Sequence, residues 1–332
     1  MITETLNELP LVSADLRAKI LSAPRTTDAH RDLFEQTDAM HFVQAGGEAT
    51  EEVLPSPLTI AAWNVERCLF PKETADKLRA EGADIVLLSE VDHGMARTGQ
   101  RHTTEEVAAH LGMAYIYGVE FFELGLGSPT EREFCEDTEN ARGWHGNAIL
   151  SAVPFNRVAL VRLDDHGHWF STEFGADPGQ PRIGGRMALL AEVETEHGPI
   201  CVVSTHLESN SNEAHRAAQF NILMDAIDDF APDLPAVIGG DLNTGNHMPP
   251  DFNWQSESLF ENARDRGYHW DGTAEGMTTR PSLITRHPDR TMKLDWFACR
   301  SLTAQSPRIV SSMNGEVPLS DHDLIVMECV RE

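Results

Sequence analysis

Short apolar runs alternate with helical patterns along the chain from residue 58 to its end. Eight of these runs have the length and residue types of β-strands, and they cover 58–65, 84–91, 146–151, 187–194, 200–207, 235–242, 293–300 and 324–330. Helical stretches lie at about 71–81, 103–111 and 212–230. Because strands and helices are interleaved and some neighbouring strands have hairpin spacing, the pattern predicts an α/β protein with mixed sheets.

The first 57 residues have a different pattern from the rest of the chain. They predict two short helices, at about 13–22 and 27–45, the second with Thr27 or Asp28 as its N-cap. Gly46-Gly47 is expected to end the second helix, and the sequence PSP at 55–57 precedes the first strand. We therefore divide the chain into a helical N-terminal extension, residues 1–57, packed on one larger domain, residues 58–332.

The charge of the chain limits what it can bind. Among 332 residues, 53 acidic and 26 basic side chains give a net charge of −27. Proteins that hold nucleic acid need surfaces that neutralise phosphates, and a strongly acidic protein repels a long polyanion. The charge therefore disfavours a nucleic acid as partner, although it leaves room for a small phosphorylated substrate held through a metal.

Cysteine usage and hydropathy bear on the compartment. The five cysteines are an odd number without CxxC spacing, and most lie in or beside apolar runs, which predicts reduced thiols. There is no run of about 18 apolar residues, as a membrane-spanning helix would need, and the N-terminus lacks the features of a secretory signal. These features predict a cytoplasmic protein, and they leave its oligomeric state open.

Polar residues end most of the predicted strands, where packing would not require them. They are Asn64, Glu90, His206, Asp241 with Asn243, Asp295, and the pair Asp321 and His322 just before the last strand. Each one alone has an ordinary explanation, such as a turn residue, a cap or a hydrogen-bonded core side chain. Since ligand sites of α/β proteins gather at strand ends, the repeated occurrence favours one shared cleft.

Asp241 and Asn243 have a spacing of special interest in the sequence IGGDLNT, residues 238–244. Residues i and i+2 of a strand point to the same face, so both side chains are expected to face one phosphate. Gly239 and Gly240 are expected to allow backbone or substrate to approach closely.

The strand-end residues also indicate a metal. Oxygen ligands are offered by Glu90, Asn64, Asp241, Asn243 and Asp321, and this set suits magnesium, with manganese as a second possibility. Because Mg²⁺ prefers few carboxylates together with phosphate oxygens, the substrate is expected to carry phosphate. The histidines can donate to that phosphate and polarise the nucleophile.

An ordered set of motifs resembles the endonuclease/exonuclease/phosphatase superfamily. The motifs are WNV (63–65), LLSEVD (87–92), GNAILS (146–151), GRMALLAEV (185–193), STHLES (204–209), GGDLNT (239–244), LDWFA (294–298) and SDHD (320–323). The resemblance spans residues 58–330 and implies a four-layered α/β/β/α sandwich, with its site between the upper edges of two packed sheets.

The resemblance also implies roles for individual residues. Glu90 would be the principal magnesium ligand, supported by Asn64 and Asp321. Asp241 would orient or deprotonate the attacking water, and Asn243 would hold that water or the phosphate. His322, polarised by Asp295, and His206 would face the phosphoryl oxygens. Arg186 stands where the family often has an arginine near the scissile group, and His145 where some members have a tyrosine.

Two segments are locally basic and flank predicted site strands. Residues 93–103 contain Arg97 and Arg101 without an acidic residue, and residues 275–300 contain five basic against three acidic residues. They are either solvated loops or a source of positive potential at the cleft, in which case Arg97 and Arg101 would bind substrate.

Three functions are compatible with these observations. The favoured one is a magnesium-dependent phosphoesterase that hydrolyses a small or lipid-derived phosphoester by in-line attack of water activated near Asp241. The alternatives are a metal-dependent nuclease acting on DNA or RNA, and a non-catalytic binding domain that retains the fold.

Overall fold

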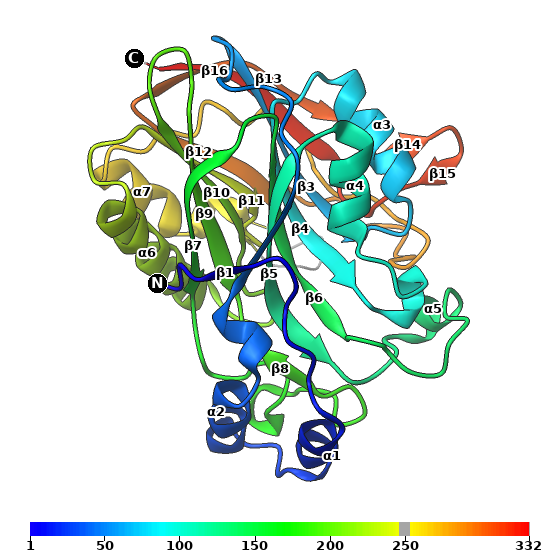
Figure 1. The fold of residues 1–332 in the computed structure, drawn as a ribbon. Coiled ribbons are helices and arrows are strands. Elements are labelled where there is room, and N and C mark those ends of the chain that lie inside the picture. The colour runs from blue at the N-terminus through cyan, green and yellow to red at the C-terminus, as the bar shows by residue number, and fades with distance from the viewer. Residues whose placement is uncertain (246–252, 332) are drawn as a thin grey trace.

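Two β-sheets packed face to face form the centre of the molecule, as the computed structural model of residues 1–245 and 253–331 shows (Figure 1). The first sheet contains, in spatial order, β1 (Thr5–Leu6), β2 (Val43–Gly47), β5 (Ala114–Glu123), β6 (Trp144–Ser151), β4 (Ile85–His93), β3 (Leu58–Arg67), β16 (Leu324–Arg331) and β13 (Leu302–Val310), and β8 (Arg182–Gly184) pairs with β5. The second sheet contains β12 (Asp295–Arg300), β11 (Ala236–Asp241), β10 (Ile200–His206), β9 (Met187–Val193) and β7 (Phe155–Arg162). A separate hairpin joins β14 (Met313–Asn314) to β15 (Val317–Pro318).

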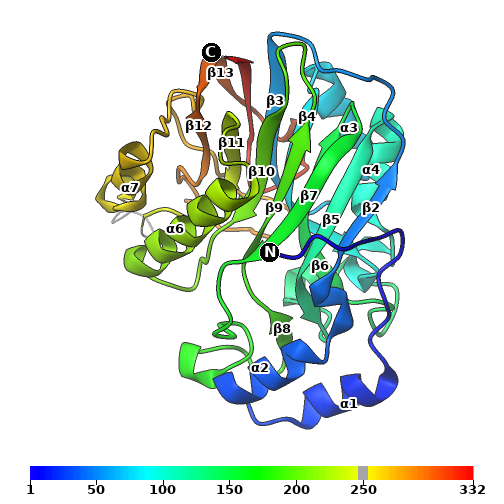
Figure 2. The ribbon, with the colours of Figure 1, turned by 60° about the vertical axis from the view of Figure 1, so that its left-hand side comes forward.

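Helices cover the outer face of each sheet (Figure 2). Helices α3 (Pro71–Ala80) and α4 (Thr103–Leu111) share a core with the first sheet, and α6 (Glu213–Phe230) and α7 (Leu259–Asp265) share one with the second. The remaining helices are α1 (Ala14–Ser22), α2 (Thr27–Glu35) and the single turn α5 (Pro129–Arg132). The order helix, sheet, sheet, helix confirms the α/β/β/α sandwich.

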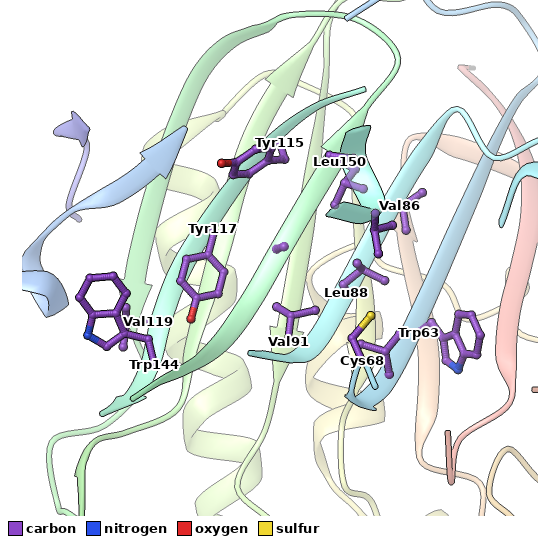
Figure 3. Close-up of a cluster of buried hydrophobic side chains, with 14 of the residues drawn as sticks. Trp63, Cys68, Val86, Leu88, Val91, Tyr115, Tyr117, Val119, Trp144 and Leu150 are labelled. Atoms are coloured by element: carbon purple, nitrogen blue, oxygen red, sulfur yellow. The ribbon is translucent and has the colours of Figure 1, made fainter. Parts of the chain in front are cut away.

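Three apolar clusters hold these layers together. The first lies under α3 and α4, and Figure 3 shows part of it, including Trp63, Leu88 and Tyr117. The second lies under α6 and α7, and the third fills the space between the sheets. Each fully buried large apolar side chain stabilises such a core by about 1.5–3 kcal/mol.

Helix α6 illustrates how the sequence forms a layer. Asn212 caps it by accepting from the backbone of His215 at 3.0 Å. Phe220, Leu223, Met224 and Ile227 are all buried in the second cluster, with the i, i+3, i+4, i+7 spacing of one helical face. The predicted helix over 212–230 is therefore confirmed, as are those at 71–81 and 103–111.

All eight predicted strands are present, but three long ones were not predicted. Strand β5 has its apolar run interrupted by Gly118 and Glu120. Strands β7 and β13 lie at sheet edges, where half-exposed polar residues break up the apolar pattern. A pattern of apolar runs detects central strands better than edges for this reason.

The N-terminal extension is only partly helical. Helix α1, which Ser13 caps, agrees with the predicted helix at about 13–22, but α2 ends at Glu35 and its N-cap is Thr26. The predicted helix over 27–45 is wrong in its second half, because residues 43–47 form β2 and pair with β5. Gly46-Gly47 therefore belongs to a strand, and a Cβ at Gly46 would lie 2.7 Å from the Tyr115 hydroxyl. Strands β1 and β2 thus make the extension part of the first sheet.

All five cysteines are free, in agreement with the prediction of reduced thiols. Within residues 1–245 and 253–331, no helix combines the length and apolar character needed to cross a bilayer.

Two buried histidines lie in contact beneath the first sheet's helices. His93 and His102 stack with ring centroids 3.8 Å apart, and neither ring nitrogen of His102 has a hydrogen-bond partner in the described part of the chain. Burial, followed by the charge of Arg142, lowers the pKa of His93 to about 3, and burial and His93 hold the pKa of His102 well below its usual value.

This pair predicts a loss of stability in acid. The unfolded chain takes up protons on both rings as the pH falls below about 6.5, while the folded chain does not, so stability is lost from there down to about pH 3. We expect His102→Phe to flatten the dependence of the unfolding free energy on pH by up to about 1.4 kcal/mol per pH unit in this window. Urea unfolding at several pH values measures the slope, and the exposed His110→Gln serves as the control. An unchanged slope in His102→Phe would contradict the assignment.

Candidate active site

Strand register in the second sheet aligns three of the predicted site residues. His206 at the end of β10 pairs with Asp241 at the end of β11, and Asp241 pairs with Asp295 at the start of β12. Directly paired residues project to the same side of a sheet. The register therefore places an imidazole and two carboxylates side by side.

The first sheet contributes Asn64 from β3 and Glu90 from β4. The pairing of β3 with β4 is irregular between Asn64 and Arg67, and that of β4 with β6 is irregular between Leu88 and Val91. Glu90 has a φ of 59°, a conformation rare for residues other than glycine. Such bulges redirect side chains, and here the Asn64 amide donates to Glu90 on the neighbouring strand at 3.1 Å and to Asp241 of the second sheet at 3.2 Å.

Asp321 and His322 enter the site from the loop before β16. Because β16 runs antiparallel to β3, the start of β16 lies beside the end of β3. The Ser320 hydroxyl donates to the Asn64 carbonyl at 2.6 Å and accepts from the His322 amide at 3.0 Å, which fixes this loop against β3.

These side chains surround one cavity of about 530 Å³ at the strand ends. It is lined by Glu66, Arg67, Glu90, Trp169, Gly175, His206, Ser209, Asn210, Asp241, Asn243, Thr285, Arg290, Asp321 and His322. The predicted residues Glu90, Asp241, Asn243, His206, His322 and Asp321 are thus brought together. Asn64 and Asp295 lie directly behind this lining, in contact with Glu90 and His322 respectively.

His322 is held as a cation by carboxylates. Its Nδ1 lies 2.8 Å from Asp295 Oδ2, and its Nε2 lies 3.6 Å from Asp241 Oδ2. Burial opposes protonation, but Asp295, Asp321 and Asp241 outweigh it and raise the pKa of His322 to about 10. The Arg290 guanidinium, which can only donate, lies 3.3 Å from Nε2, so His322 presents a donor there only when Arg290 turns away.

His206 is neutral and carries its proton on Nε2, and an arginine rather than a carboxylate sets this state. Arg186 can only donate, and its guanidinium lies 2.8 Å from His206 Nδ1, so Nδ1 accepts and Nε2 carries the proton. Burial, followed by the charge of Arg186, keeps the pKa of His206 well below its usual value. Nε2 lies 3.6 Å from Asp241 Oδ2, so two imidazoles flank this carboxylate.

Arg186 itself does not line the cavity. It is buried between Glu120, at 3.2 Å, and Glu208, at 3.3 Å. Arg186 therefore lies behind the lining, in contact with His206 and with the cavity residue Ser209, and substrate binding by Arg186 stays a prediction.

Asp241 and Asn243 both line the cavity, but not by strand alternation. Strand β11 ends at Asp241, and Asn243 has a left-handed backbone with φ of 48°. The Asn243 amide N–H donates to Asp241 Oδ1 at 2.8 Å, and its side chain donates to the Leu207 carbonyl at 3.0 Å. The turn thus fixes the carboxylate, whose pKa burial raises to about 7.

The two glycines before Asp241 serve the sheets rather than a substrate. A Cβ at Gly240, whose φ is 149°, would lie 1.9 Å from the Thr205 carbonyl on β10. A Cβ at Gly239 would lie 2.7 Å from Leu87 of the other sheet. Neighbouring strands therefore pack closely against this backbone, where the sequence predicted the approach of backbone or substrate.

Eight lining residues were not predicted as site residues, and two of them, Glu66 and Arg67, directly follow the WNV motif. Glu66 accepts from the Ser282 hydroxyl at 2.6 Å, from the Thr285 amide at 3.0 Å and from the Asp321 amide at 3.1 Å. Arg67 forms ion pairs with Glu90 and, at 2.8 Å, with Glu131. Although burial opposes ionisation, Arg67 holds the pKa of Glu90 well below its usual range. Their positions at the bulged end of β3 were the available signal.

The donors fit a hard cation. Glu66, Glu90, Asp241 and Asp321 bring four carboxylates to one cavity, and burial together with Asp321 raises the pKa of Glu66 to about 8. Crowded carboxylates of this kind favour a bound cation with oxygen preference. Asn64 differs from the expectation, because its Oδ1 accepts from the Glu66 amide at 3.1 Å and its NH₂ faces the carboxylates.

The other predicted substrate-binding residues lie away from the cavity lining. His145 is buried, with Nδ1 2.8 Å from Asp92. Arg97 is completely buried among carboxylates, and Arg101 donates to the Leu69 and Thr98 carbonyls at 2.8 and 2.7 Å. Direct substrate contact by Arg97 does not fit this burial.

The basic residues of the two segments form ion pairs, some with distant residues and others with acidic residues within or beside the same segment. Their ion pairs are Arg97 with Asp92, Arg101 with Glu106, Arg280 with Asp323, Arg286 with Glu133, Arg290 with Asp321, Lys293 with Glu275 and Arg300 with Asp228. The segments therefore do not form an unpaired basic track beside the cavity.

Comparisons with known proteins agree with this geometry. The model of the endonuclease/exonuclease/phosphatase family matches residues 61–322. Among solved structures, the fold is similar to an endonuclease/exonuclease/phosphatase from Beutenbergia cavernae, with a TM-score of 0.58, 20% identity and coverage of 82% of this chain and 71% of that chain. It is also similar to the human Nocturnin catalytic domain with bound sulfate (0.56, 18%, 87% and 97%) and to a Bacteroides thetaiotaomicron mannosyl-6-phosphatase (0.53, 14%, 82% and 99%). A search of curated proteins gives no significant match.

Proposed function

Because the chain belongs to the endonuclease/exonuclease/phosphatase family, we propose that it is a magnesium-dependent phosphoesterase that hydrolyses a small phosphate ester. One observation carries the proposal. Asp241 Oδ2 lies 3.6 Å from Nε2 of both His206 and His322, beside the carboxylates Glu90 and Asp321. A base flanked by two donors next to a cation site is suited to attack of water on phosphorus.

Glu90 and Asp321 would hold the metal, with Glu66 as a further carboxylate at the same cavity. When bound, Mg²⁺ would neutralise negative charge on the phosphoryl oxygens. Mn²⁺ suits the same oxygen donors.

The protein side chains would perform the remaining steps. The Asp241 carboxylate accepts a proton from the attacking water, and the hydrogen bond from the Asn243 amide keeps it oriented. Nε2 of His206 and of His322 donate to phosphoryl oxygens as charge develops on them. Asp295 keeps His322 protonated and fixes its ring.

The surroundings of the cavity favour a compact substrate. Arg67 and Arg290, the cavity's two arginines, are each paired with a carboxylate. Together with the net charge of −27 and the neutralised basic segments, this arrangement offers few free cations for a long polyanion. A lipid-derived ester remains within the proposal if its phosphorylated head enters the cavity.

A hydrolysis panel tests the proposal. The purified protein, stripped with EDTA, is assayed with Mg²⁺ or Mn²⁺ on a sugar phosphate, an activated phosphodiester, phosphoinositides, sphingomyelin, and single- and double-stranded nucleic acid. We expect hydrolysis of a small or lipid ester that depends on added metal and is lost in Asp241→Asn. Activity on nucleic acid alone, weakened steeply by salt, would establish the nuclease alternative. No activity with any metal would favour a binding domain.

A further inference from the structure

A second cluster of titratable side chains lies outside the cavity, where the segment after β7 crosses the start of α6. The ligand atoms of Asp164, His168 and His215 all lie within 4.8 Å of one another. Asp164 Oδ2 is 3.4 Å from His215 Nε2, and Asp164 Oδ1 is 3.9 Å from His168 Nδ1. None of these residues lines the catalytic cavity.

His168 is the residue that separates this cluster from an ordinary hydrogen-bonded group. Its side chain is only 7% exposed, and its Nδ1 has no hydrogen-bond partner within residues 1–245 and 253–331. The ring is held in place by stacking on Phe174, at a centroid distance of 4.3 Å. A buried ring nitrogen without a partner is destabilising, and here it faces a carboxylate oxygen at 3.9 Å, beyond hydrogen-bonding distance.

We propose that Asp164, His168 and His215 bind a transition-metal ion of the zinc class. Zinc takes imidazole nitrogens and carboxylate oxygens at about 2.0–2.1 Å, which in a tetrahedron places ligand atoms about 3.4 Å apart. His215 Nε2 lies at that distance from Asp164 Oδ2, His168 Nδ1 lies 3.9 Å from the other oxygen, Oδ1, and the ligand atoms of all three residues lie within 4.8 Å of one another. Neighbouring atoms thus need only small shifts to share one ion.

The surroundings of the cluster support a metal centre. Gln219, one turn after His215 on α6, donates to Asp164 Oδ2 at 2.5 Å, as an outer hydrogen bond that orients a ligand. The exposed ring of His166 lies 5.6 Å from that of His215 and can rotate to supply a fourth ligand, a place that water can also take. A surface cavity of about 380 Å³, lined by Asp164, His166, His215 and Gln219, gives an entry path.

The site would connect the N-terminal extension with the wall of the catalytic cavity. On one side Arg31 of α2 pairs with Asp165 at 2.8 Å, and Thr27 donates to the His166 carbonyl at 3.2 Å. On the other side Trp169, next to His168, lines the catalytic cavity. A metal ion bound by Asp164, His168 and His215 would link the segment after β7 to α6.

Metal binding tests the proposal independently of any hydrolytic activity. The full chain, stripped of metal and held in excess Mg²⁺, is titrated with Zn²⁺ by calorimetry and with Co²⁺ by absorption spectroscopy. We expect one zinc equivalent that His215→Ala weakens at least 10-fold, and the intense visible bands of four-coordinate cobalt in the wild type. His215 is half-buried on the first turn of α6, so its replacement by alanine should fold, which a thermal melt checks.

Two controls separate this site from others. Asp241→Asn alters the catalytic cavity and should retain the zinc equivalent, and His110→Ala removes an exposed histidine and should behave as wild type. Equal zinc affinity and cobalt spectra in wild type and His215→Ala would overturn the proposal. So would loss of the zinc equivalent in Asp241→Asn, because the ion would then belong to the catalytic cavity. Absence of four-coordinate cobalt bands from the wild type would overturn it even if His215→Ala failed to fold.

Discussion

Asp241→Asn is expected to lower kcat on the best substrate of the panel by about 10²–10⁴-fold, the range typical for loss of a general base. The amide has nearly the shape of the carboxylate, and its oxygen can still accept from the Asn243 amide, which donates to Asp241 Oδ1 at 2.8 Å in the native protein. What it cannot do is accept a proton from water. Its NH₂ takes the place of Oδ2, which accepts from the Asn64 amide at 3.2 Å in the native protein, so the free energy of unfolding should also fall, by about 1–3 kcal/mol. The rate is therefore compared under conditions in which the variant is folded.

The matched control is Asp229→Asn, the same change on the exposed face of α6. Its rate and its stability should both equal those of the wild type. Steady-state kinetics at saturating Mg²⁺ and urea unfolding measure the two quantities for each variant. A rate loss below about tenfold in Asp241→Asn would exclude a base at this position.

Much of the fold could be predicted because buried apolar positions recur along the sequence in patterns typical of strands and helices. Central strands such as β10 and β11 are apolar on both faces, and α6 keeps one apolar stripe. Edge strands β7 and β13 were missed because many of their residues face solvent and need not be apolar. Residues 43–45 were assigned to a helix, and Gly46-Gly47 to its end, because the partner that makes them a strand, β5, lies about 70 positions later in the chain.

The candidate site was predictable to the extent that strand ends determine it. His206, Asp241 and Asp295 end or begin neighbouring strands, and their register brings them together. Glu66 and Arg67 were missed because they lie at the bulged end of β3, where alternation no longer says which way a side chain points. Asn243 was placed at the cavity for the wrong reason, since a turn directs it there rather than strand periodicity.

Arg97 shows most clearly what the sequence could not reveal. Its segment, residues 93–103, contains no acid, so its charge suggested a free cation for substrate. In the fold, the completely buried guanidinium contacts Asp92 at 2.8 and 2.9 Å, Glu123 at 2.9 Å and Glu131 at 3.0 Å. Although burial opposes ionisation of Glu123, Arg182 and Arg97 lower its pKa to about 2. Two of the three partners lie 26 and 34 positions away, so the charges within the segment could not reveal them.

Arg97→Met should therefore unfold far more easily than the wild type, by about 3–5 kcal/mol, because it leaves three buried carboxylates without their common cation. Methionine fills much of the same volume, so loss of packing contributes little to this effect. Arg286→Met is the matched control, since Arg286 and its partner Glu133 are 51% and 55% exposed and such surface pairs contribute only about 0–1 kcal/mol. Urea unfolding at neutral pH measures both variants. A loss below about 1 kcal/mol would contradict this structural role, and would mean that Arg67, paired with Glu131, Arg182, paired with Glu123, and proton uptake compensate for the missing guanidinium.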